Sequence, residues 1–325
     1  MAESKDSIIE VVDLTKYYEN LLAVDHISFE VKKGEVFGFL GPNGAGKTTT
    51  IRMLTGLSRP TSGRASILGF DINQHRVEIK HHIGVVPEIS NLYDELSALD
   101  NLLFMARLYG VPGPQRRKRA EELLKLFGLE DRKDSLFGTF SRGMKRALTI
   151  AAGLIHKPEI LFLDEPTVGL DVVAARSLRN LISNLHQQGI TIFLTTHYLE
   201  EADLLCDRVA ILVKGQIIKV DSPQALKALA QEESVIEFSF RKEASAFLDN
   251  LAAKLPEARV VAVNHNTVRI YGGVVTSIYT QVCKFAEEFH LEILAVNTIR
   301  PSLEDAFIKI TGLSPTVMAM EKGAK

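Results

Sequence analysis

Cysteine is scarce in this chain, because only Cys206 and Cys283 occur among its 325 residues. Two cysteines so far apart argue against a disulfide scaffold and are typical of a reducing compartment. No apolar run approaches the length that a membrane-spanning helix needs. The polar first residues also lack the apolar centre of a signal peptide. Together these absences predict a soluble, intracellular protein.

A strong excess of one charge is absent as well, since 38 basic and 40 acidic residues give a formal net charge of −2. A protein held on nucleic acid by charge alone is more basic, and we expect no nucleic-acid partner. The basic run Gln115–Arg119 is followed by Glu121 and Glu122, which favours a solvated helix face. A composition with 46% hydrophobic residues excludes a disordered chain, and the length favours about two domains.

The first domain, residues 1–220, has the pattern of an α/β fold. Short apolar runs bounded by polar or turn residues predict buried strands, and helical patterns lie between several of them. Strands that alternate with helices are typical of a mainly parallel sheet. One predicted helix, Val172–Gln187, ends before Gly189 as a C-cap. The predicted strands are Glu35–Leu40, Gly84–Val86, Glu159–Leu163, Ile190–Thr195 and Arg208–Val213, with a hairpin at 209–220.

The remaining residues differ in their pattern. Residues 221–232 begin with a short polar helix and are interpreted as a linker. Residues 233–312 predict the order β-α-β-β-α-β and then a final helix, which indicates a small ferredoxin-like α+β domain. This domain shows no His, Cys and carboxylate cluster with metal-ligand spacing, so we interpret it as a dimerisation or regulatory module. Residues 313–325 are predicted to be a flexible tail.

The strongest motif is a phosphate loop, with the sequence Gly-Pro-Asn-Gly-Ala-Gly-Lys-Thr at residues 41–48. A strand pattern precedes it and a helix pattern follows it, as this loop requires. Its glycines allow backbone N–H groups to surround a phosphate, and the helix N-terminus favours anions. We expect Lys47 to reach the β- and γ-phosphates of ATP and the Thr48 hydroxyl to bind Mg²⁺. The predicted nucleotide contacts are Gly41, Pro42, Asn43, Gly44, Ala45, Gly46, Lys47, Thr48 and Thr49.

A second motif is an apolar strand that ends in two carboxylates, Asp164 and Glu165. Acidic residues at the end of a strand are common, and taken alone they indicate only a strand end that faces solvent. After a phosphate loop, the pair instead predicts that Asp164 holds Mg²⁺, directly or through water. Glu165 is then expected to polarise the attacking water.

With these two motifs in order, the chain resembles the nucleotide-binding subunits of ATP-binding-cassette (ABC) transporters. Residues 140–145, Phe-Ser-Arg-Gly-Met-Lys, are similar to the family signature, which is usually Leu-Ser-Gly-Gly-Gln. The resemblance covers residues from about 8 to 220. It implies a phosphate-loop core sheet, an N-terminal antiparallel section and a helical subdomain at about 89–157.

Further positions match the family in the expected order. Val168–Asp171 resembles the D-loop, which implies that Asp171 lies at the nucleotide. His197, 32 residues after the second carboxylate, resembles the switch histidine that contacts the γ-phosphate and orients water. Tyr18 resembles the aromatic residue on which adenine stacks, and Tyr17 is the alternative. Taken alone, His197 would indicate a buried structural histidine and Tyr18 ordinary surface packing.

The signature is interpreted physically as a second helix N-terminus that binds phosphate. The Ser141 hydroxyl and the Gly143 N–H would face a γ-phosphate, although a lone Ser-x-Gly would indicate only a helix cap. Within one chain we expect the signature to lie too far from Lys47 to share a nucleotide. The resemblance therefore implies two chains arranged head to tail, as a homodimer or heterodimer of ATPase subunits with ATP between them.

Two motifs depart from the family pattern. Glu88 stands where the Q-loop normally carries Gln. Its carboxylate offers only acceptors, so it could ligate Mg²⁺, or it could face a partner and never meet the metal. In the signature, Arg142 replaces the first Gly and Met144 replaces the Gln. Signatures of this type resemble those of single-cassette subunits that serve separately encoded exporter-type membrane subunits.

The sequence thus predicts an ATPase that hydrolyses ATP with Mg²⁺ and powers a separate integral membrane permease for export. We expect it on the cytoplasmic, inner face of the cell membrane. Two alternatives stay open: a soluble ABC ATPase without transport, and a regulatory subunit that hydrolyses ATP weakly because of Glu88. The 117 residues from Lys47 to Asp164 leave no room for the long coiled coil of DNA-repair cassettes. Nothing in the sequence specifies the transported substrate.

Overall fold

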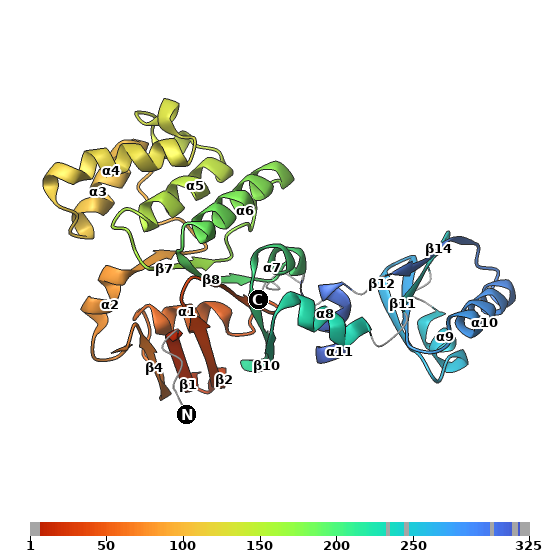
Figure 1. Ribbon diagram of the computed structural model, residues 1–325. Helices are drawn as coiled ribbons and strands as arrows, with labels where there is room; N and C mark the ends of the chain where they lie inside the picture. The colour runs from red at the N-terminus through yellow and green to blue at the C-terminus, as the bar shows by residue number, and fades with distance from the viewer. Residues whose placement is uncertain (1–6, 232–234, 244–246, 300–301, 314–317, 319–325) are drawn as a thin grey trace. The chain divides into compact units, whose positions relative to one another are not determined.

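The computed structural model describes residues 7–231, 235–243, 247–299, 302–313 and 318. The chain divides into two compact units, which we name the cassette unit (residues 1–220) and the C-terminal unit (residues 221–325). Figure 1 labels the helices and strands of both. No helix in the described ranges combines the length and the apolar character needed to cross a bilayer.

The cassette unit is built around a six-stranded sheet with the order β10-β9-β3-β8-β7-β6. The neighbours β9-β3-β8-β7-β6 pair in parallel, and β3, β7 and β8 are buried along their whole length, as strands covered on both faces must be. The mainly parallel sheet expected from the apolar runs is confirmed. Its strands are β3 (Val36–Leu40), β6 (Ile83–Val86), β7 (Ile160–Asp164), β8 (Thr191–Thr196), β9 (Arg208–Val213) and β10 (Gln216–Asp221).

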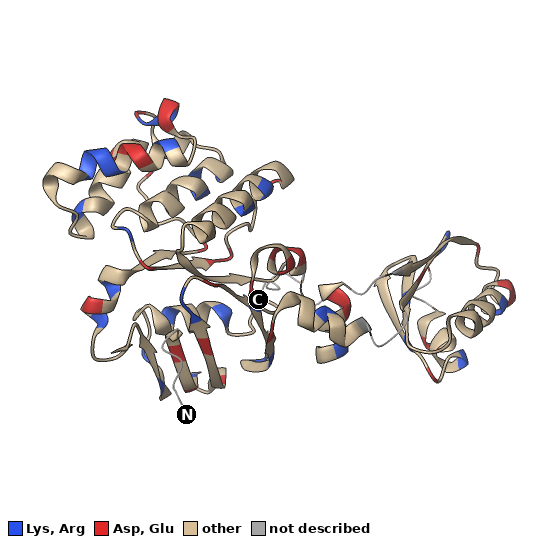
Figure 2. Cartoon of the chain, viewed as in Figure 1, with Lys and Arg blue, Asp and Glu red and all other residues tan. Residues whose placement is uncertain are grey.

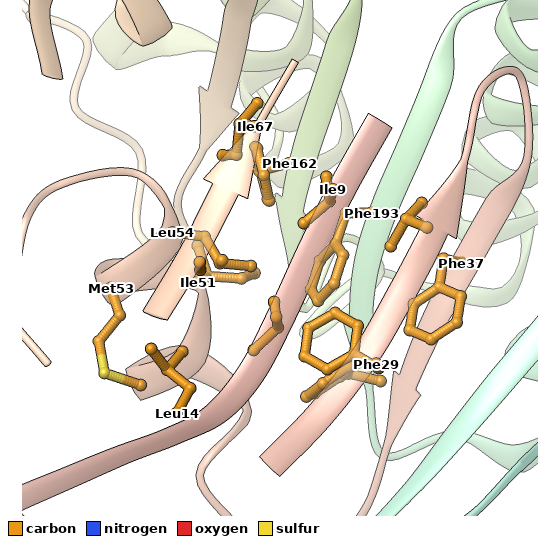
Figure 3. Packing of buried hydrophobic residues seen from close by; sticks show 14 of the residues in the cluster. Ile9, Leu14, Phe29, Phe37, Ile51, Met53, Leu54, Ile67, Phe162 and Phe193 are labelled. Atoms are coloured by element: carbon orange, nitrogen blue, oxygen red, sulfur yellow. The ribbon is translucent and has the colours of Figure 1, made fainter. Parts of the chain in front are cut away.

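A second, antiparallel sheet packs against this core. Its order is β2-β1-β4-β5, from strands β1 (Ser7–Tyr18), β2 (Leu21–Lys32), β4 (Ser62–Ile67) and β5 (Phe70–Asp71). Phenylalanines join the two sheets: Phe29 of β2 has its ring centroid 5.5 Å from that of Phe37 and 4.9 Å from that of Phe39. Figure 3 shows Phe29, Phe37 and Phe193 with Ile51 of helix α1 (Lys47–Leu54). Each such side chain stabilises the fold by about 1.5–3 kcal/mol when fully buried.

Three helices form a subdomain within residues 98–153: α3 (Ala98–Leu108), α4 (Gly113–Leu126) and α5 (Arg142–Gly153). They lie together at the end of the unit away from β1 and β2 (Figure 1). Figure 2 shows basic and acidic residues next to one another on α4, where Arg117 Nε lies 3.0 Å from Glu121 Oε1. The remaining helices of the unit are α2 (Arg76–His82), α6 (Val172–Gln187) and α7 (Leu199–Leu205).

The C-terminal unit contains a four-stranded antiparallel sheet with the order β12-β13-β11-β14. One face of this sheet packs against α9 and α10 through a core that includes Phe238, Phe240, Ile270, Val282 and Phe285. The β-α-β-β-α-β order agrees with the predicted one. The elements are β11 (Val235–Phe240), α9 (Leu248–Lys254), β12 (Arg259–Asn264), β13 (Thr267–Tyr271), α10 (Val275–Glu288), β14 (Ile293–Ile299) and α11 (Leu303–Thr311).

The segment interpreted as a linker contains a packed helix, α8 (Pro223–Gln231). Leu226 and Ala230 are buried, and Lys309 Nζ of α11 donates to Leu229 O at 2.7 Å. Because α8 has an apolar face and α11 covers it, this segment belongs to the C-terminal unit and is more than a tether. Of the predicted flexible tail, residues 314–317 and 319–325 lie outside the described residues.

Candidate nucleotide-binding site

The phosphate loop joins β3 to α1, as the motif predicts. Gly46 begins α1 with φ +103°, in the left-handed region that favours glycine. A side chain there would also collide with β2, since an ideal Cβ at Gly46 lies 2.6 Å from Ala23 O. Within the described residues no side chain caps α1, so its first N–H groups are available to an anion.

Lys47 lies at the centre of the site and is buried. Its Nζ donates to Gly41 O at 2.6 Å and to Pro42 O at 3.2 Å, and it lies 3.1 Å from Glu165 Oε1. The ammonium group is therefore held between the loop and the second carboxylate. In this position it can exchange loop carbonyls for phosphate oxygens of ATP.

Asp164 ends β7 and faces the start of α1. Its Oδ1 accepts from Thr48 Oγ1 at 3.1 Å and from Thr195 Oγ1 at 2.6 Å. Asp164 and Thr195 are paired across parallel strands, which explains why residues 31 positions apart meet here. A carboxylate beside a hydroxyl offers the hard oxygen ligands that Mg²⁺ prefers, so these side chains fit that ion.

Glu165 and His197, each identified from its own motif, contact one another. His197 Nδ1 lies 2.9 Å from Glu165 Oε2, and because an ionised carboxylate only accepts, Nδ1 carries the hydrogen. Burial alone would raise the pKa of Glu165, but the hydrogen bond from His197 and the charge of Lys47 outweigh burial and lower it. Glu165 has φ +46°, a strained value for a residue other than glycine, and its N donates to Thr195 O at 3.2 Å.

The signature and the D-loop meet each other at two helix N-termini. Ser141 caps α5 by accepting from Met144 N at 3.3 Å, and Asp171 caps α6 by accepting from Ala174 N at 2.8 Å. An ideal Cβ at Gly143 lies 3.0 Å from Ala174 Cβ, so the two helix starts touch. Ser141 and Asp171 are exposed, and in the described residues no hydrogen bond joins either to the phosphate loop.

A cavity of about 800 Å³ lies beside the signature between α4, α5 and α6. Ser141, Gly143 and Asp171 are in its lining, together with apolar residues such as Leu178. The residues of the phosphate loop are not in that lining. The structure thus brings Lys47, Asp164, Glu165 and His197 into one group and the signature and D-loop into another.

Tyr18 and Tyr17 end β1, with 40% and 43% of their surface exposed. They pair with Leu21 and Leu22, next to Ala23, whose carbonyl approaches Gly46. Either ring lies on the strand pair that borders the loop, and the assignment of adenine stacking to Tyr18 stays a prediction. Among the predicted contacts in the loop, Asn43 is exposed and Thr49 partly exposed, whereas Gly41, Ala45 and Lys47 are buried.

Glu88 is exposed just after β6. In the described part of the chain no hydrogen bond or ion pair joins its carboxylate to Thr48 or Asp164. Its backbone carbonyl instead accepts from Arg146 Nη1 at 3.3 Å. The proposed role of Glu88 as a magnesium ligand therefore stays a prediction.

Two buried charged residues beside the site were not anticipated from the sequence. Arg146 of α5 donates to the backbone carbonyls of Glu88 and Asp164. Glu201 of α7 is 2% exposed, and burial raises its pKa to about 7. Both residues lie in helical patterns where a charge normally faces solvent, so no local sequence signal marks them.

Comparison with known proteins identifies the family. The family model described as ABC transporter matches residues 24–168. The linearmycin resistance ATP-binding protein LnrL of Bacillus subtilis (strain 168) is 36% identical over 311 residues, covering 94% of this chain and 98% of that protein. The chain belongs to the ATP-binding subunits of ABC transporters.

Two further similarities support this ABC assignment. The bacitracin transport ATP-binding protein BcrA of Bacillus licheniformis is 36% identical, over 94% of this chain and 98% of its own length. The solved dimer of the ATP-binding cassette MJ0796, in a post-hydrolysis state with ADP and Pi, has a TM-score of 0.60 and 27% identity, covering 66% of this chain and 98% of that one. The ABC cassette fold predicted from the motifs is confirmed, and this ABC subunit is an ATPase that binds ATP.

Proposed function

We propose that this ABC subunit hydrolyses ATP at two composite sites of a dimer and thereby powers a separate integral membrane permease for export. The observation that carries the catalytic part is the series Lys47, Glu165 and His197, of which the first two are buried and His197 partly buried, beside a helix N-terminus that no side chain of the described residues caps. Each of these groups has a defined hydrogen-bond partner, so the arrangement is fixed before ATP binds.

The residues of the chain divide the chemistry among them. The loop N–H groups and Lys47 stabilise negative charge on the β- and γ-phosphates as the terminal P–O bond breaks. Glu165, kept ionised by its neighbours, accepts hydrogen bonds from the attacking water and orients it. His197 holds the Glu165 carboxylate through Nδ1, and its ring would lie at the γ-phosphate, as the family resemblance implies.

Thr48 and Asp164 would hold Mg²⁺, with Glu88 as a third candidate, and the ion would neutralise charge on the phosphates. The hydrogen bond from Thr195 to Asp164 orients that carboxylate before any ion arrives. Thr195 therefore supports the metal ligand without being a ligand itself. This division resembles the usual pattern in which hydrogen-bonded neighbours fix a metal ligand.

The second half of each site would come from another ATPase subunit. Ser141, Gly143 and Asp171 lie on helix N-termini at the surface, where a nucleotide bound to a partner can reach them. ABC ATP-binding subunits dimerise and act with membrane permeases, and MJ0796 forms a dimer with ADP and Pi. Closing and opening of this dimer would move the permease through the surface around Glu88 and the helical subdomain.

The direction of transport is inferred from the relatives. LnrL is named for linearmycin resistance and BcrA for bacitracin transport, and both match almost the full length of this chain. These names support export, with the subunit held on the inner face of the cell membrane by its permease. Co-purification with an integral membrane protein encoded beside it would test the permease directly, and recovery of the subunit without one would contradict this part.

The catalytic assignment is tested by Glu165→Gln, measured as steady-state ATPase activity and ATP-dependent dimer formation. We expect turnover to fall by about 10²–10⁴-fold, because the carboxylate that orients water is lost, while ATP still binds and the dimer accumulates. Glu200→Gln is the matched control, since this glutamate is 75% exposed on the nearby α7. Retained turnover in Glu165→Gln would contradict the assignment.

A further inference from the structure

Arg146 lies on α5, five residues after the signature serine, and is 8% exposed. Its guanidinium group contacts two separate segments. Nε donates to Pro166 O at 2.9 Å, just beyond β7, and Nη2 donates to Asp164 O at 2.7 Å, at the last residue of β7. Nη1 donates to Pro87 O and to Glu88 O, the latter at 3.3 Å, just beyond β6.

These four carbonyls lie at or just beyond the ends of two parallel strands, and a buried carbonyl without a partner is costly. A planar guanidinium with five N–H donors can satisfy several of them at once, whereas a lysine ammonium cannot span them. Burial lowers the pKa of Arg146 to about 10, and the charges of Asp164, Glu201, Glu88 and Glu165 offset part of that effect. All four hydrogen bonds of the guanidinium group go to backbone carbonyl oxygens of these two segments.

We propose that Arg146 is a positioning residue that holds the Glu88 segment and the Asp164–Pro166 segment at a fixed separation and ties both to the signature helix. This inference rests on the proposed function, because it has α5 act at both nucleotides of the proposed dimer. The N-terminus of α5 would meet the nucleotide of the partner subunit. Four residues further on, α5 sets the positions of the candidate magnesium ligands in its own chain.

The test is Arg146→Lys, which keeps the positive charge and removes the fork of donors. We measure binding of a fluorescent ATP analogue as Mg²⁺ is titrated, and steady-state hydrolysis in parallel. Binding without Mg²⁺ should change less than about threefold, because Lys47 and the loop are untouched. The Mg²⁺ concentration for half-maximal response should rise about tenfold, and kcat should fall by a larger factor than KM rises.

Arg119→Lys is the matched control. Arg119 also anchors α5, because its Nη2 donates to Leu154 O at 3.2 Å, but it does so at the opposite end of the helix. A general loosening of α5 would move the Mg²⁺ titration in both variants. The inference is overturned if Arg146→Lys shifts that titration no more than Arg119→Lys does.

Hydrogen–deuterium exchange on the unmodified protein provides a second test that does not depend on a variant that folds. Amides of residues 88–90 and of Glu165, Thr167 and Val168 should gain protection at the same Mg²⁺ concentration when ATP is present, because one guanidinium joins both segments. Protection at clearly different concentrations would contradict the inference. Both binding readouts are independent of turnover, so a protein that binds ATP with Mg²⁺ but does not hydrolyse it would refute the proposed function alone.

Discussion

Each of the two units contains a helix N-terminus beside buried charged residues, but the two N-termini differ in whether a side chain caps them. In the cassette unit α1 begins at Gly46 with no side-chain cap in the described residues. In the C-terminal unit α11 begins at Ser302 with a complete capping box, in which Asp305 Oδ2 accepts from Ser302 N at 2.7 Å. Among the described residues, the backbone N–H groups at the start of α1 therefore have no side-chain cap, whereas those at the start of α11 are capped from within the helix.

The charges around Asp305 satisfy one another. Its Oδ1 accepts from Tyr271 Oη at 2.6 Å and from Arg269 Nη1 at 3.2 Å, while Arg269 Nε donates to Glu237 at 2.9 Å. Burial opposes the charge of Arg269, but the hydrogen bond to Glu237 and the charges of Asp305 and Glu304 outweigh burial and raise its pKa. Burial and the hydrogen bond to Asp305 also raise the pKa of Tyr271.

This comparison separates structural from catalytic use of buried charge. The Asp305 cluster is complete without any ligand, which is the expected state for charges that hold a fold together. Around α1, by contrast, Lys47 is bound to loop carbonyls that phosphate can replace, and Glu165 is held at a strained backbone angle. Strain and an open helix end beside buried charge are features that proteins keep where a ligand binds.

The largest expected effect is on the stability of the C-terminal unit, through the cluster around Asp305. Asp305→Ala should lower the free energy of unfolding of the C-terminal unit by about 3–5 kcal/mol, because Arg269 and Tyr271 lose a buried partner and α11 loses its cap. ATP hydrolysis per folded molecule should not change. Urea denaturation followed by circular dichroism, together with an ATPase assay, measures the two quantities.

Glu304→Ala is the control for this change, since Glu304 is partly exposed and lies 3.5 Å from Arg269. An exposed pair of this kind contributes at most about 1 kcal/mol. If Asp305→Ala and Glu304→Ala lowered the free energy of unfolding equally, the buried Asp305 cluster would contribute no more to stability than a partly exposed ion pair. Loss of ATP hydrolysis in folded Asp305→Ala would show that the cluster is more than structural.

Local patterns predicted much of the cassette unit. The apolar runs identify the parallel strands because strands covered on both faces carry few polar residues. The helix Val172–Gln187 was predicted with the bounds that the structure has, since an amphipathic pattern ended before Gly189. Motif order also brought Lys47 and Glu165 together, because both follow strands whose ends lie at the same edge of one sheet.

The residues that the sequence did not reveal depend on contacts between distant segments. Arg146 binds carbonyls 18 to 59 positions away, and its burial depends on where β6 and β7 end. Asp305 looks like an ordinary acidic residue in the first turn of a helix, and only the fold brings Arg269 and Tyr271 to it. The sequence pattern of residues 221–232 does not show that the helix within them is packed, because its partner, α11, lies about 80 residues later.

A second expected effect concerns Glu201, a buried carboxyl in the cassette unit. Its oxygens lie near the hydroxyls of Thr196 and Thr167, yet they make no hydrogen bond of ordinary geometry within the described residues. Burial therefore raises its pKa from 4.5 to about 7, with the charge of Glu165 adding to the shift. This carboxyl is therefore mostly protonated below about pH 7.

The sign of the pH effect follows from that raised pKa. A group that binds its proton more tightly when folded stabilises the fold fully below pH 4.5 and loses this contribution as pH rises through about 7. Glu201→Gln should abolish this loss, so the variant should gain stability relative to the parent by on the order of 2–3 kcal/mol between pH 4.5 and 8. Thermal denaturation at several pH values measures the difference. A difference that is constant with pH would show that Glu201 is ionised in the folded protein.

The smallest expected effect concerns Glu88, which is exposed next to the open site. Its charge should repel the phosphates when Mg²⁺ is scarce, so Glu88→Gln should make ATP binding depend less steeply on Mg²⁺. The change should be about two- to fivefold, because a solvated charge contributes at most about 1 kcal/mol. Hydrolysis measured across a Mg²⁺ titration gives the result, and Glu95→Gln, an exposed residue of the same segment, is the control. Curves that coincide for the parent and Glu88→Gln would place Glu88 away from the metal and leave Thr48 and Asp164 as its ligands from this chain.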